Sequence, residues 1–213
     1  WSSSAASDVY KRQDVNKFKP SYSFGDRSRS FLKIQDGCDY QCSYCTIPLA
    51  RGKSRSPSLD NVTDSIKSLL DKGVKEVVLT GVNIGDFGIF DPKKPRQNNF
   101  LDLLNQISKI KDLKRLRISS IEPNLLNNDI IDLVSESKKI LPHFHIPLQS
   151  GSDKILKLMK RRYLRNVYEK RFEYIRKRIP NACIGSDVII GFPGEDELEF
   201  METYNFLKSI DIS

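Results

Sequence analysis

Residues 31–45 read FLKIQDGCDYQCSYC, a strand-like run followed at once by three closely spaced cysteines. Cys38, Cys42 and Cys45 form a C-x3-C-x2-C array, and Tyr44 directly precedes the last of them. Thiolates are soft ligands that select zinc, copper(I) or iron–sulfur clusters, and these spacings let one short loop wrap a single metal centre. The stretch therefore predicts a metal-binding loop at the C-terminal end of a strand.

The number of cysteines in this loop narrows the choice of metal centre. Four cysteines usually hold a four-iron four-sulfur cluster, and the loop supplies only three. The one other cysteine, Cys183, lies far along the chain, and we expect it to be a core residue. A three-thiolate loop indicates a cluster with one iron left open to a small molecule.

A zinc site is the main alternative to a cluster. Zinc sites usually pair a C-x2-C unit with a second pair of cysteines or histidines, and the only histidines are His143 and His145. These two alternate along an expected strand and would share a face, which ordinary strand packing explains equally well. Disulfides are disfavoured, because nothing resembles a signal peptide and cytosolic thiols stay reduced. We expect a cytoplasmic protein, with a cluster favoured over zinc.

The composition is that of a folded domain with a basic surplus. The chain has 213 residues, 38% of them hydrophobic, and a net charge of +8. No apolar run approaches the length of a membrane span. The surplus is concentrated in residues 160–178, where apolar residues also recur at helical spacing. Both a solvated helix face and a phosphate-binding surface fit this segment, and charge alone supports only non-specific attraction to nucleic acid.

The order of segments predicts an α/β fold. Residues 1–30 are expected to be a disordered or linker segment, in which residues 1–13 could be non-native sequence, and residues 31–213 to be the core domain. About five strand–helix units argue for parallel strands that curl into a partial (β/α) TIM-like barrel. Residues 210–213 could start a sixth strand, so we expect a C-terminally truncated core. The expected strands cover 31–35, 75–80, 115–119, 143–147 and 183–190, and the expected helices cover 58–72, 100–110, 127–138, 154–160, 164–178 and 196–208.

Small and polar residues follow each expected strand, at the end where parallel sheets and barrels build their sites. One such loop means little, because glycine and proline are ordinary turn residues. A polar cluster at every strand end, beside three cysteines, favours a shared site over connecting turns. These residues are Thr80, Gly81, Asn83, Ser119, Ser120, Glu122, Gln149, Ser150 and the turn Gly191-Phe192-Pro193-Gly194-Glu195.

The chain resembles the radical S-adenosylmethionine (SAM) core of the methylthiotransferases. The resemblance is carried, in family order, by FLKIQDGCDYQCSYCTIPLARGKSRS, TGVNIGDFG, SSIEP, HIPLQSGS, LMKRRY and DVIIGFPGE. It covers residues 31–213 almost continuously. The segments after the second and third strands resemble the branch that acts on threonylcarbamoyladenosine in tRNA. The flanking domains of the complete enzymes, one with three more cysteines and one that binds RNA, have no counterpart in this sequence.

The resemblance implies a role for each matching residue. Cys38, Cys42 and Cys45 would bind a 4Fe-4S cluster, and Tyr44 would shield it. Thr80, Gly81 and Asn83 would lie near the methionine amino group of SAM, and Arg161 near its carboxylate. Ser120 and Glu122 would lie near the ribose or the substrate. The remaining predicted cofactor contacts are Gln149 and, in the adenine-side turn, Gly191 and Pro193, while Arg51 would contact substrate or order the loop.

The resemblance also implies a reaction. The cluster would cleave SAM reductively, and the resulting radical would take hydrogen from carbon 2 of N6-threonylcarbamoyladenosine in tRNA, where a methylthio group is installed. The implied partners are tRNA and an electron donor such as flavodoxin or ferredoxin, without a membrane. Two alternatives stay open. The first is another radical SAM enzyme, which would act on a different tRNA base or on a ribosomal protein, or would not thiolate its substrate. The second is a zinc-binding RNA-associated module. Without the flanking domains we expect SAM cleavage but not complete methylthiolation.

Overall fold

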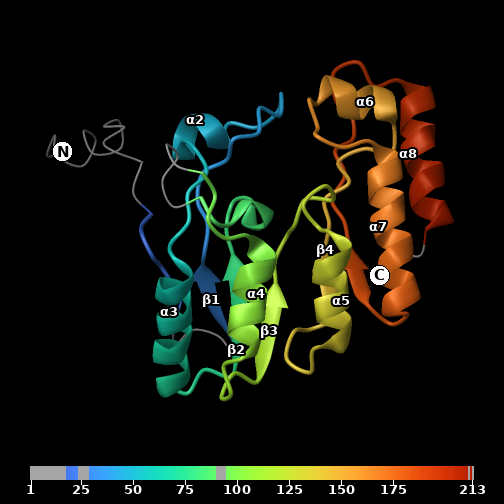
Figure 1. Cartoon of the computed structure of the whole chain (residues 1–213). Coiled ribbons are helices and arrows are strands. Elements are labelled where there is room, and N and C mark those ends of the chain that lie inside the picture. Colours follow the sequence, from blue (N-terminus) through green and yellow to red (C-terminus); the bar gives the residue numbers. More distant parts are fainter. Residues whose placement is uncertain (1–17, 24–28, 90–94, 211, 213) are drawn as a thin grey trace, which may run out of the picture.

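A computed structural model describes residues 18–23, 29–89, 95–210 and 212 of the chain (Figure 1). The expected non-native segment 1–13 lies outside these residues, as do residues 211 and 213 of the possible sixth strand. Of the expected N-terminal linker, residues 18–23 are described, and they run antiparallel to the first strand. Tyr22 bridges to Leu32, and the Lys33 amide donates to the Ser21 carbonyl at 3.0 Å.

The described strands are all parallel. They form a three-stranded sheet in the order β1-β2-β3 and a two-stranded sheet of β4 and β5. Bridges from Leu116 to Ile140 and from Ser120 to His145 continue the arc from the first sheet to the second. The predicted succession of parallel strands is therefore present. Their bounds are β1 Ser30–Lys33, β2 Glu76–Thr80, β3 Arg115–Ile118, β4 His143–His145 and β5 Cys183–Gly185.

Two strands are shorter than the apolar pattern predicts. β4 ends at His145, before Pro147, which has no amide hydrogen for a ladder. β5 ends at Gly185, and beyond it only Val188 bridges back, to Gln149. The Ser186 hydroxyl instead donates to the Ile146 carbonyl at 2.9 Å, so a side chain replaces the backbone ladder there.

Four of the described helices, α3, α4, α5 and α8, begin at a residue whose side chain caps the helix. Ser58 accepts from the Asn61 amide, and capping boxes pair Asn99 with Asp102 and Asp196 with Glu199. The short elements α2 and η1 were not predicted. The helices are α2 Ile47–Arg51, α3 Leu59–Asp71, η1 Ile84–Asp86, α4 Phe100–Ser108, α5 Asn128–Glu136, α6 Asp153–Leu158, α7 Arg165–Arg178 and α8 Glu197–Ser209.

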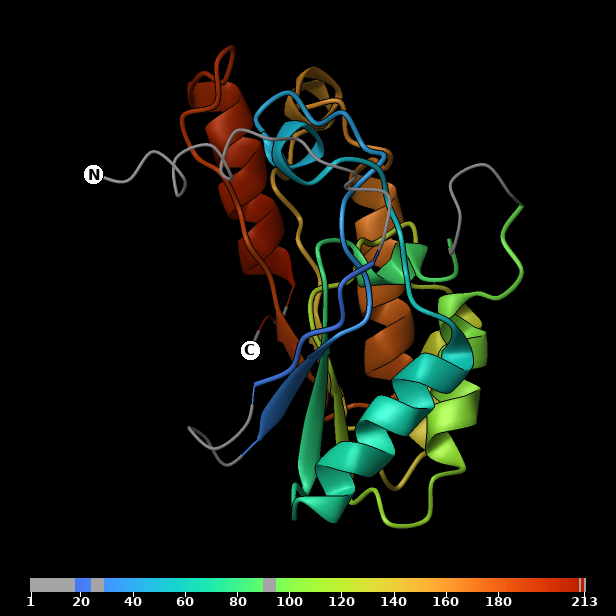
Figure 2. The same cartoon turned by 90° about the vertical axis from the view of Figure 1, so that its left-hand side faces the viewer.

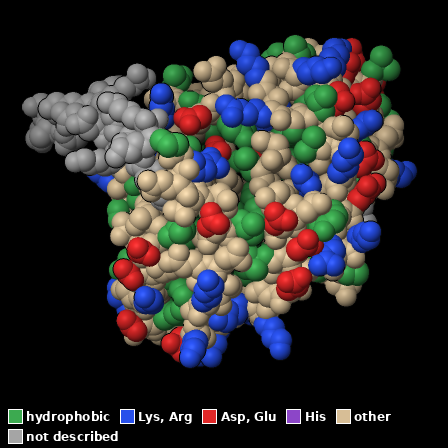
Figure 3. Space-filling view, in the orientation of Figure 1, with side chains coloured by type: hydrophobic (Ala, Val, Ile, Leu, Met, Phe, Trp, Pro, Cys, Tyr) green, Lys and Arg blue, Asp and Glu red, His purple; other side chains and the backbone are tan. Residues whose placement is uncertain are grey.

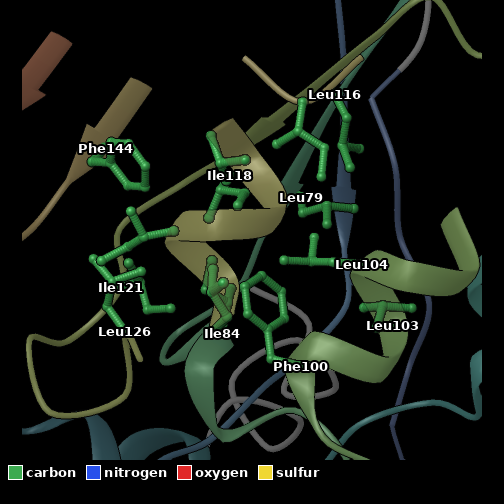
Figure 4. Close-up of a cluster of buried hydrophobic side chains, with 14 of the residues drawn as sticks. Leu79, Ile84, Phe100, Leu103, Leu104, Leu116, Ile118, Ile121, Leu126 and Phe144 are labelled. Atoms are coloured by element: carbon green, nitrogen blue, oxygen red, sulfur yellow. The ribbon is translucent and has the colours of Figure 1, made fainter. Parts of the chain in front are cut away.

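The core lies between the strands and the helices on one of their faces. α3 and α4 lie on the same side of the strands in Figure 2. Figure 4 shows Phe100 and Leu104 of α4 beside Leu79 of β2 and Ile118 of β3, and all four are at most 2% exposed. Every other strand residue points to this core, because side chains alternate across a strand.

The opposite face of the strands is polar. Glu76 lies within 4 Å of three arginines on this side, at 3.8 Å from Arg29, 3.1 Å from Arg115 and 3.2 Å from Arg117. Cys183 also alternates onto this face and is exposed, so the expectation of a core cysteine was wrong. Its neighbour Ile184 takes the core position instead.

All five described strands point their C-terminal ends toward α2 and α6, at one end of the molecule (Figure 1). The loops that follow these strands therefore converge there. They include the cysteine loop after β1, the loop after β2 and the turns after β3 and β4. Among the described residues, no helix is long and apolar enough to cross a bilayer.

Candidate functional site at the cysteine loop

The three cysteines of the loop line one cavity of about 200 Å³. Cys42 is buried, and Cys38 and Cys45 are half-buried. Burial raises the pKa of the Cys38 thiol to about 11. The other lining residues are Tyr40, Tyr44, Ile47, Val82, Asn83, Glu122, Gln149 and Arg161. The cavity thus joins thiols to side chains from the ends of β2, β3 and β4.

Gln35 links the base of the cysteine loop to the loop after β2. Its buried amide nitrogen donates to the Gly37 carbonyl at 2.7 Å and to the Ser54 hydroxyl at 2.9 Å. Its side-chain oxygen accepts from the Asn83 amide at 2.7 Å. One fully buried side chain therefore sets the spacing between two loops that are far apart in sequence. The sequence offered a signal that we did not use, a polar residue at a buried strand end.

The backbone that follows the cysteines packs closely against the start of the loop. A Cβ on Gly37, whose φ is +70°, would lie 2.1 Å from the Lys53 carbonyl oxygen, so this position requires glycine. The Cys38 amide donates to the Gly52 carbonyl at 3.0 Å. Asp36 and Arg55, both nearly buried, form an ion pair at 2.8 Å. Arg51 lies 3.9 Å from the Asp36 carboxylate. Of the two roles expected for Arg51, this contact fits the ordering of the loop.

Arg161, from the segment between α6 and α7, also lines the cavity. Its side chain is 3% exposed and forms an ion pair with Glu122. It also donates to Cys42 Sγ at 3.2 Å, Tyr44 Oη at 3.0 Å and Tyr163 Oη at 3.1 Å. Burial by itself lowers the pKa of Arg161, but the Glu122 carboxylate together with the Tyr163 and Tyr44 side chains outweighs burial and raises it. Arg161 is therefore a fixed cation beside the thiols.

Asn83, which lines the cavity, has a buried hydrogen-bond acceptor without a partner among the described residues. Its side-chain nitrogen donates to Asp86 at 2.9 Å, whereas its buried Oδ1 has no partner among the described residues. The Nε of Arg161 is likewise buried and unpartnered there. Buried polar atoms without partners are uncommon in folded proteins, and each calls for an explanation such as a bound group. Two residues that line the cavity thus each keep one buried polar atom without a partner.

The structure brings together half of the predicted cofactor contacts. Tyr44, Asn83, Glu122, Gln149 and Arg161 line the cavity with the cysteines. Gln149 has a φ of +67°, a strained conformation for a residue with a side chain. Such strain concentrates at functional sites.

The other predicted contacts lie outside the cavity. Thr80 and Gly81 line a neighbouring hollow of about 490 Å³ together with Asp36 and Arg51. The Ser120 hydroxyl is 2.6 Å from Nδ1 of His145. Gly191 and Pro193 flank Phe192, whose ring meets that of Tyr44 edge-on at 6.5 Å.

A larger hollow lies elsewhere and lacks comparable chemistry. It encloses about 800 Å³ between α3 and residues 18–22 and is lined mainly by serine, proline and apolar side chains. A hollow of about 530 Å³, in contrast, shares Cys38 and Tyr40 with the cysteine cavity. The chemistry of the lining residues therefore identifies the site better than the volume of the hollow does.

The donor set fits a cluster better than a single metal ion. Among the described residues, no three His, Cys, Asp or Glu side chains converge closely enough to hold one ion. Zinc–sulfur bonds of about 2.3 Å would require such convergence. In a four-iron cluster each thiolate binds a different iron, so three sulfurs around a cavity suit it. His143 and His145, the histidines of the zinc alternative, do not line this cavity.

Comparison with known proteins places this geometry in a family. Residues 32–207 match the family model described as the radical SAM superfamily. The chain belongs to the radical SAM superfamily. The cysteine loop, the parallel strands and the converging strand ends of this radical SAM chain all lie within the matched residues.

Curated relatives of the radical SAM chain include tRNA methylthiotransferases. It is 43% identical over 201 residues to threonylcarbamoyladenosine tRNA methylthiotransferase MtaB of Bacillus subtilis (strain 168), covering 94% of this chain and 42% of that protein. It is 41% identical to MtaB of Aquifex aeolicus (strain VF5), covering 97% and 49%. A tRNA-2-methylthio-N(6)-dimethylallyladenosine synthase of Desulforamulus reducens (strain ATCC BAA-1160 / DSM 100696 / MI-1) is 38% identical, covering 87% and 40%. The predicted resemblance to methylthiotransferases is confirmed, and the chain spans less than half the length of these relatives.

Solved structures confirm the predicted fold. The radical SAM methyltransferase TsrM of Kitasatospora setae, solved with cobalamin and a [4Fe-4S] cluster bound, matches with a TM-score of 0.68 at 17% identity, covering 85% of this chain and 34% of TsrM. Methylornithine synthase PylB matches with a TM-score of 0.56 at 15% identity, covering 85% and 50%. The radical SAM chain therefore has the predicted α/β partial barrel.

Proposed function

We propose that this chain is the SAM-cleaving core of a tRNA methylthiotransferase that acts on N6-threonylcarbamoyladenosine. The observation that carries the proposal is the cavity in which three thiols meet an unpartnered asparagine oxygen and a buried arginine. The identities of 43% and 41% to two MtaB proteins support the substrate. For these 213 residues by themselves, the proposed activity is reductive cleavage of SAM.

Cys38, Cys42 and Cys45 would hold a 4Fe-4S cluster with one iron open to SAM. When bound and reduced, the cluster would supply the electron for reductive cleavage of SAM. The protein's own task is to orient SAM and to keep water and oxygen away from the site. The residues around the cavity suit this task.

Each polar residue of the cavity has a proposed part in orienting SAM. Asn83 Oδ1 would accept a hydrogen bond from the methionine amino group, and Arg161 would face the carboxylate with its free Nε. Glu122 keeps the guanidinium oriented and the pair neutral. Tyr44, held edge-on by Phe192, covers the loop from the solvent side. Gln149 holds its strained turn because its backbone pairs with Asp187 and Ile189 at 2.9 and 2.8 Å.

The proposed partners follow from the substrate. An adenine in a tRNA loop would have to leave its stack to reach the strand ends, as other base-modifying enzymes require. Flavodoxin or ferredoxin is the proposed electron donor, and the cytoplasm the proposed location. The 38% identity to a dimethylallyladenosine enzyme keeps a neighbouring substrate branch as the second candidate.

The test is anaerobic reconstitution of the chain with iron and sulfide, followed by SAM and a strong reductant. We expect 5′-deoxyadenosine and methionine in equal amounts, and none from a C38A/C42A/C45A variant. Retention of zinc instead of iron, or absence of 5′-deoxyadenosine from a fully loaded cluster protein, would overturn the proposal. Binding competition between tRNAs with threonylcarbamoyl- and dimethylallyl-modified adenosine separates the two substrate branches.

A further inference from the structure

The cysteine loop is held from outside by the segment that joins α6 to α7. This segment, residues 158–163, is called the clasp below. The Ser43 amide donates to the Met159 carbonyl at 3.1 Å, and the Ser43 hydroxyl donates to the Leu158 carbonyl at 2.9 Å. Ser43 lies between Cys42 and Cys45, so these two bonds fix the middle of the ligand array.

A second contact lies at the start of the array. Arg162 donates to the Asp39 carbonyl at 2.9 Å, and its guanidinium lies 4.0 Å from the centre of the Tyr40 ring. Tyr40 is buried, and its hydroxyl accepts from Asn124 at 2.8 Å. Arg162 therefore covers the residues between Cys38 and Cys42, which Ser43 does not reach.

The third contact touches a ligand directly. Arg161 bonds to Cys42 Sγ and to the Tyr44 hydroxyl, and thus connects the clasp to both sides of Ser43. The loop has few bonds of its own by comparison. From Asp39 to Cys45, the backbone bond within the loop is that of the Cys45 amide to the Cys42 carbonyl at 3.1 Å.

The clasp itself is rigid. Met159 is fully buried, and Tyr163 is 4% exposed with its hydroxyl on the Pro147 and Leu148 carbonyls at 2.7 and 3.1 Å. Lys160 has a φ of +55°, and the amides of Lys160 and Arg161 bond back to α6 at 2.9 Å. A firmly anchored segment thus supports a loop that lacks regular secondary structure.

We propose that the clasp holds the three thiols in position before any metal arrives, so that the cluster enters a preformed site. The inference rests on the proposed function, because it takes the thiols to be cluster ligands. Metal sites seldom exist in an unfolded chain, so a loop already ordered by protein contacts loses less freedom when the metal binds. Arg162 and Ser43 act here as positioning residues, since they touch the loop and not the cofactor.

The test compares S43A/R162M with a matched control, S65A/R165M. Ser65 donates its hydroxyl to a helix carbonyl at 2.7 Å, and Arg165 lies 5.5 Å from the Phe206 ring, so the control removes similar groups away from the loop. In metal-free S43A/R162M we expect Cys42 to be alkylated, and the backbone amide of residue 43 to exchange, about 25-fold faster than in the wild type, since the two lost hydrogen bonds contribute roughly fivefold each. After reconstitution, a chelator should remove iron correspondingly faster.

The single variants keep the test decisive if the double variant folds poorly. S43A and R162M should each give an intermediate rate, and R162K, which keeps the cation over Tyr40, should lie nearer the wild type. Alkylation and exchange rates equal to those of S65A/R165M would overturn the proposal that the clasp positions the thiols. If the wild-type chain holds no iron, the proposed function fails, whereas the alkylation and exchange rates of metal-free protein still decide the clasp.

Discussion

The Nη1 atom of Arg161 lies 3.2 Å from Sγ of Cys42, although 119 positions separate the two residues in sequence. The same guanidinium pairs with Glu122 from the end of β3. One buried cation therefore connects the cysteine loop, the third strand and the clasp. Its removal should affect both the stability of the fold and the site.

The first prediction concerns this ion pair. R161M should lower the free energy of unfolding by about 3–5 kcal/mol, because it leaves the Glu122 carboxylate without its partner in a largely buried place. R161M/E122L should lose less than R161M alone, since neither charge remains buried. Urea unfolding of the metal-free chain measures both. A double variant less stable than R161M would contradict the assignment of the loss to an unpaired charge.

The second prediction concerns the free acceptor of Asn83. N83A should weaken SAM binding to the reconstituted protein by about tenfold, close to the 1–1.5 kcal/mol of one hydrogen bond in a dry site. N105A, a change at an exposed asparagine of α4, serves as the control. Calorimetry with SAM gives both dissociation constants. Equal affinity of N83A and the wild type for SAM would show that the methionine amino group does not bind to Asn83.

The third prediction is a pH dependence of stability. Contacts with Asp196, followed by the hydrogen bond from Lys154, lower the pKa of Glu199 to about 2. A depressed carboxyl pKa stabilises the folded state above the unfolded pKa of about 4.3, and that contribution disappears as the pH falls toward 2. The wild type should therefore be more stable than E199Q by a constant margin above pH 5, and the margin should vanish by about pH 2. Thermal unfolding across this range checks it, and a margin independent of pH would refute it.

The fourth prediction concerns the basic segment 160–178. Its arginines largely make contacts within the chain, at the surface: Arg171 donates to Asn128, Arg178 pairs with Asp132, and Arg176 lies 5.2 Å from the Phe172 ring. Figure 3 shows acidic and basic side chains interspersed on the face that it presents. The structure thus favours a structural role for these arginines over a phosphate-binding surface.

R171E/R176E should accordingly lower the free energy of unfolding by about 1–3 kcal/mol and leave the salt dependence of tRNA binding unchanged. K170E/K177E, at exposed lysines of the same helix, should be close to neutral for stability. Filter binding at several salt concentrations, with unfolding curves for both variants, tests this. A shallower salt slope in R171E/R176E without loss of stability would show that the arginines contact RNA.

Local patterns were sufficient for much of the fold. The cysteine spacing lies within eight consecutive residues, and the alternation of strand and helix signals is equally local, so both could be found from sequence. The apolar run at 183–190 did not predict that Ser186 would replace the backbone ladder of β5, because that bond joins residues 40 positions apart. Cys183 was misplaced because its face depends on the register of a strand, which a single residue does not reveal.

The candidate site was predicted in part for the same reason. Asn83, Glu122, Gln149 and Arg161 follow strand ends or match a family motif, and all four line the cavity. Gln35 and the support of Ser43 by the clasp were missed, because the bonds from Gln35 to Asn83 and from Ser43 to Leu158 arise only when distant loops meet. No periodicity along the chain encodes such contacts.

The central claim is that Cys38, Cys42 and Cys45 hold a cluster whose fourth iron takes SAM. The most direct measurement is electron paramagnetic resonance of the anaerobically reconstituted, reduced chain with and without SAM, together with iron and sulfide analysis. We predict about four iron and four sulfide per chain and a cluster signal that changes on addition of SAM. A colourless protein with stoichiometric zinc, or a cluster signal that SAM leaves unchanged, would contradict the account.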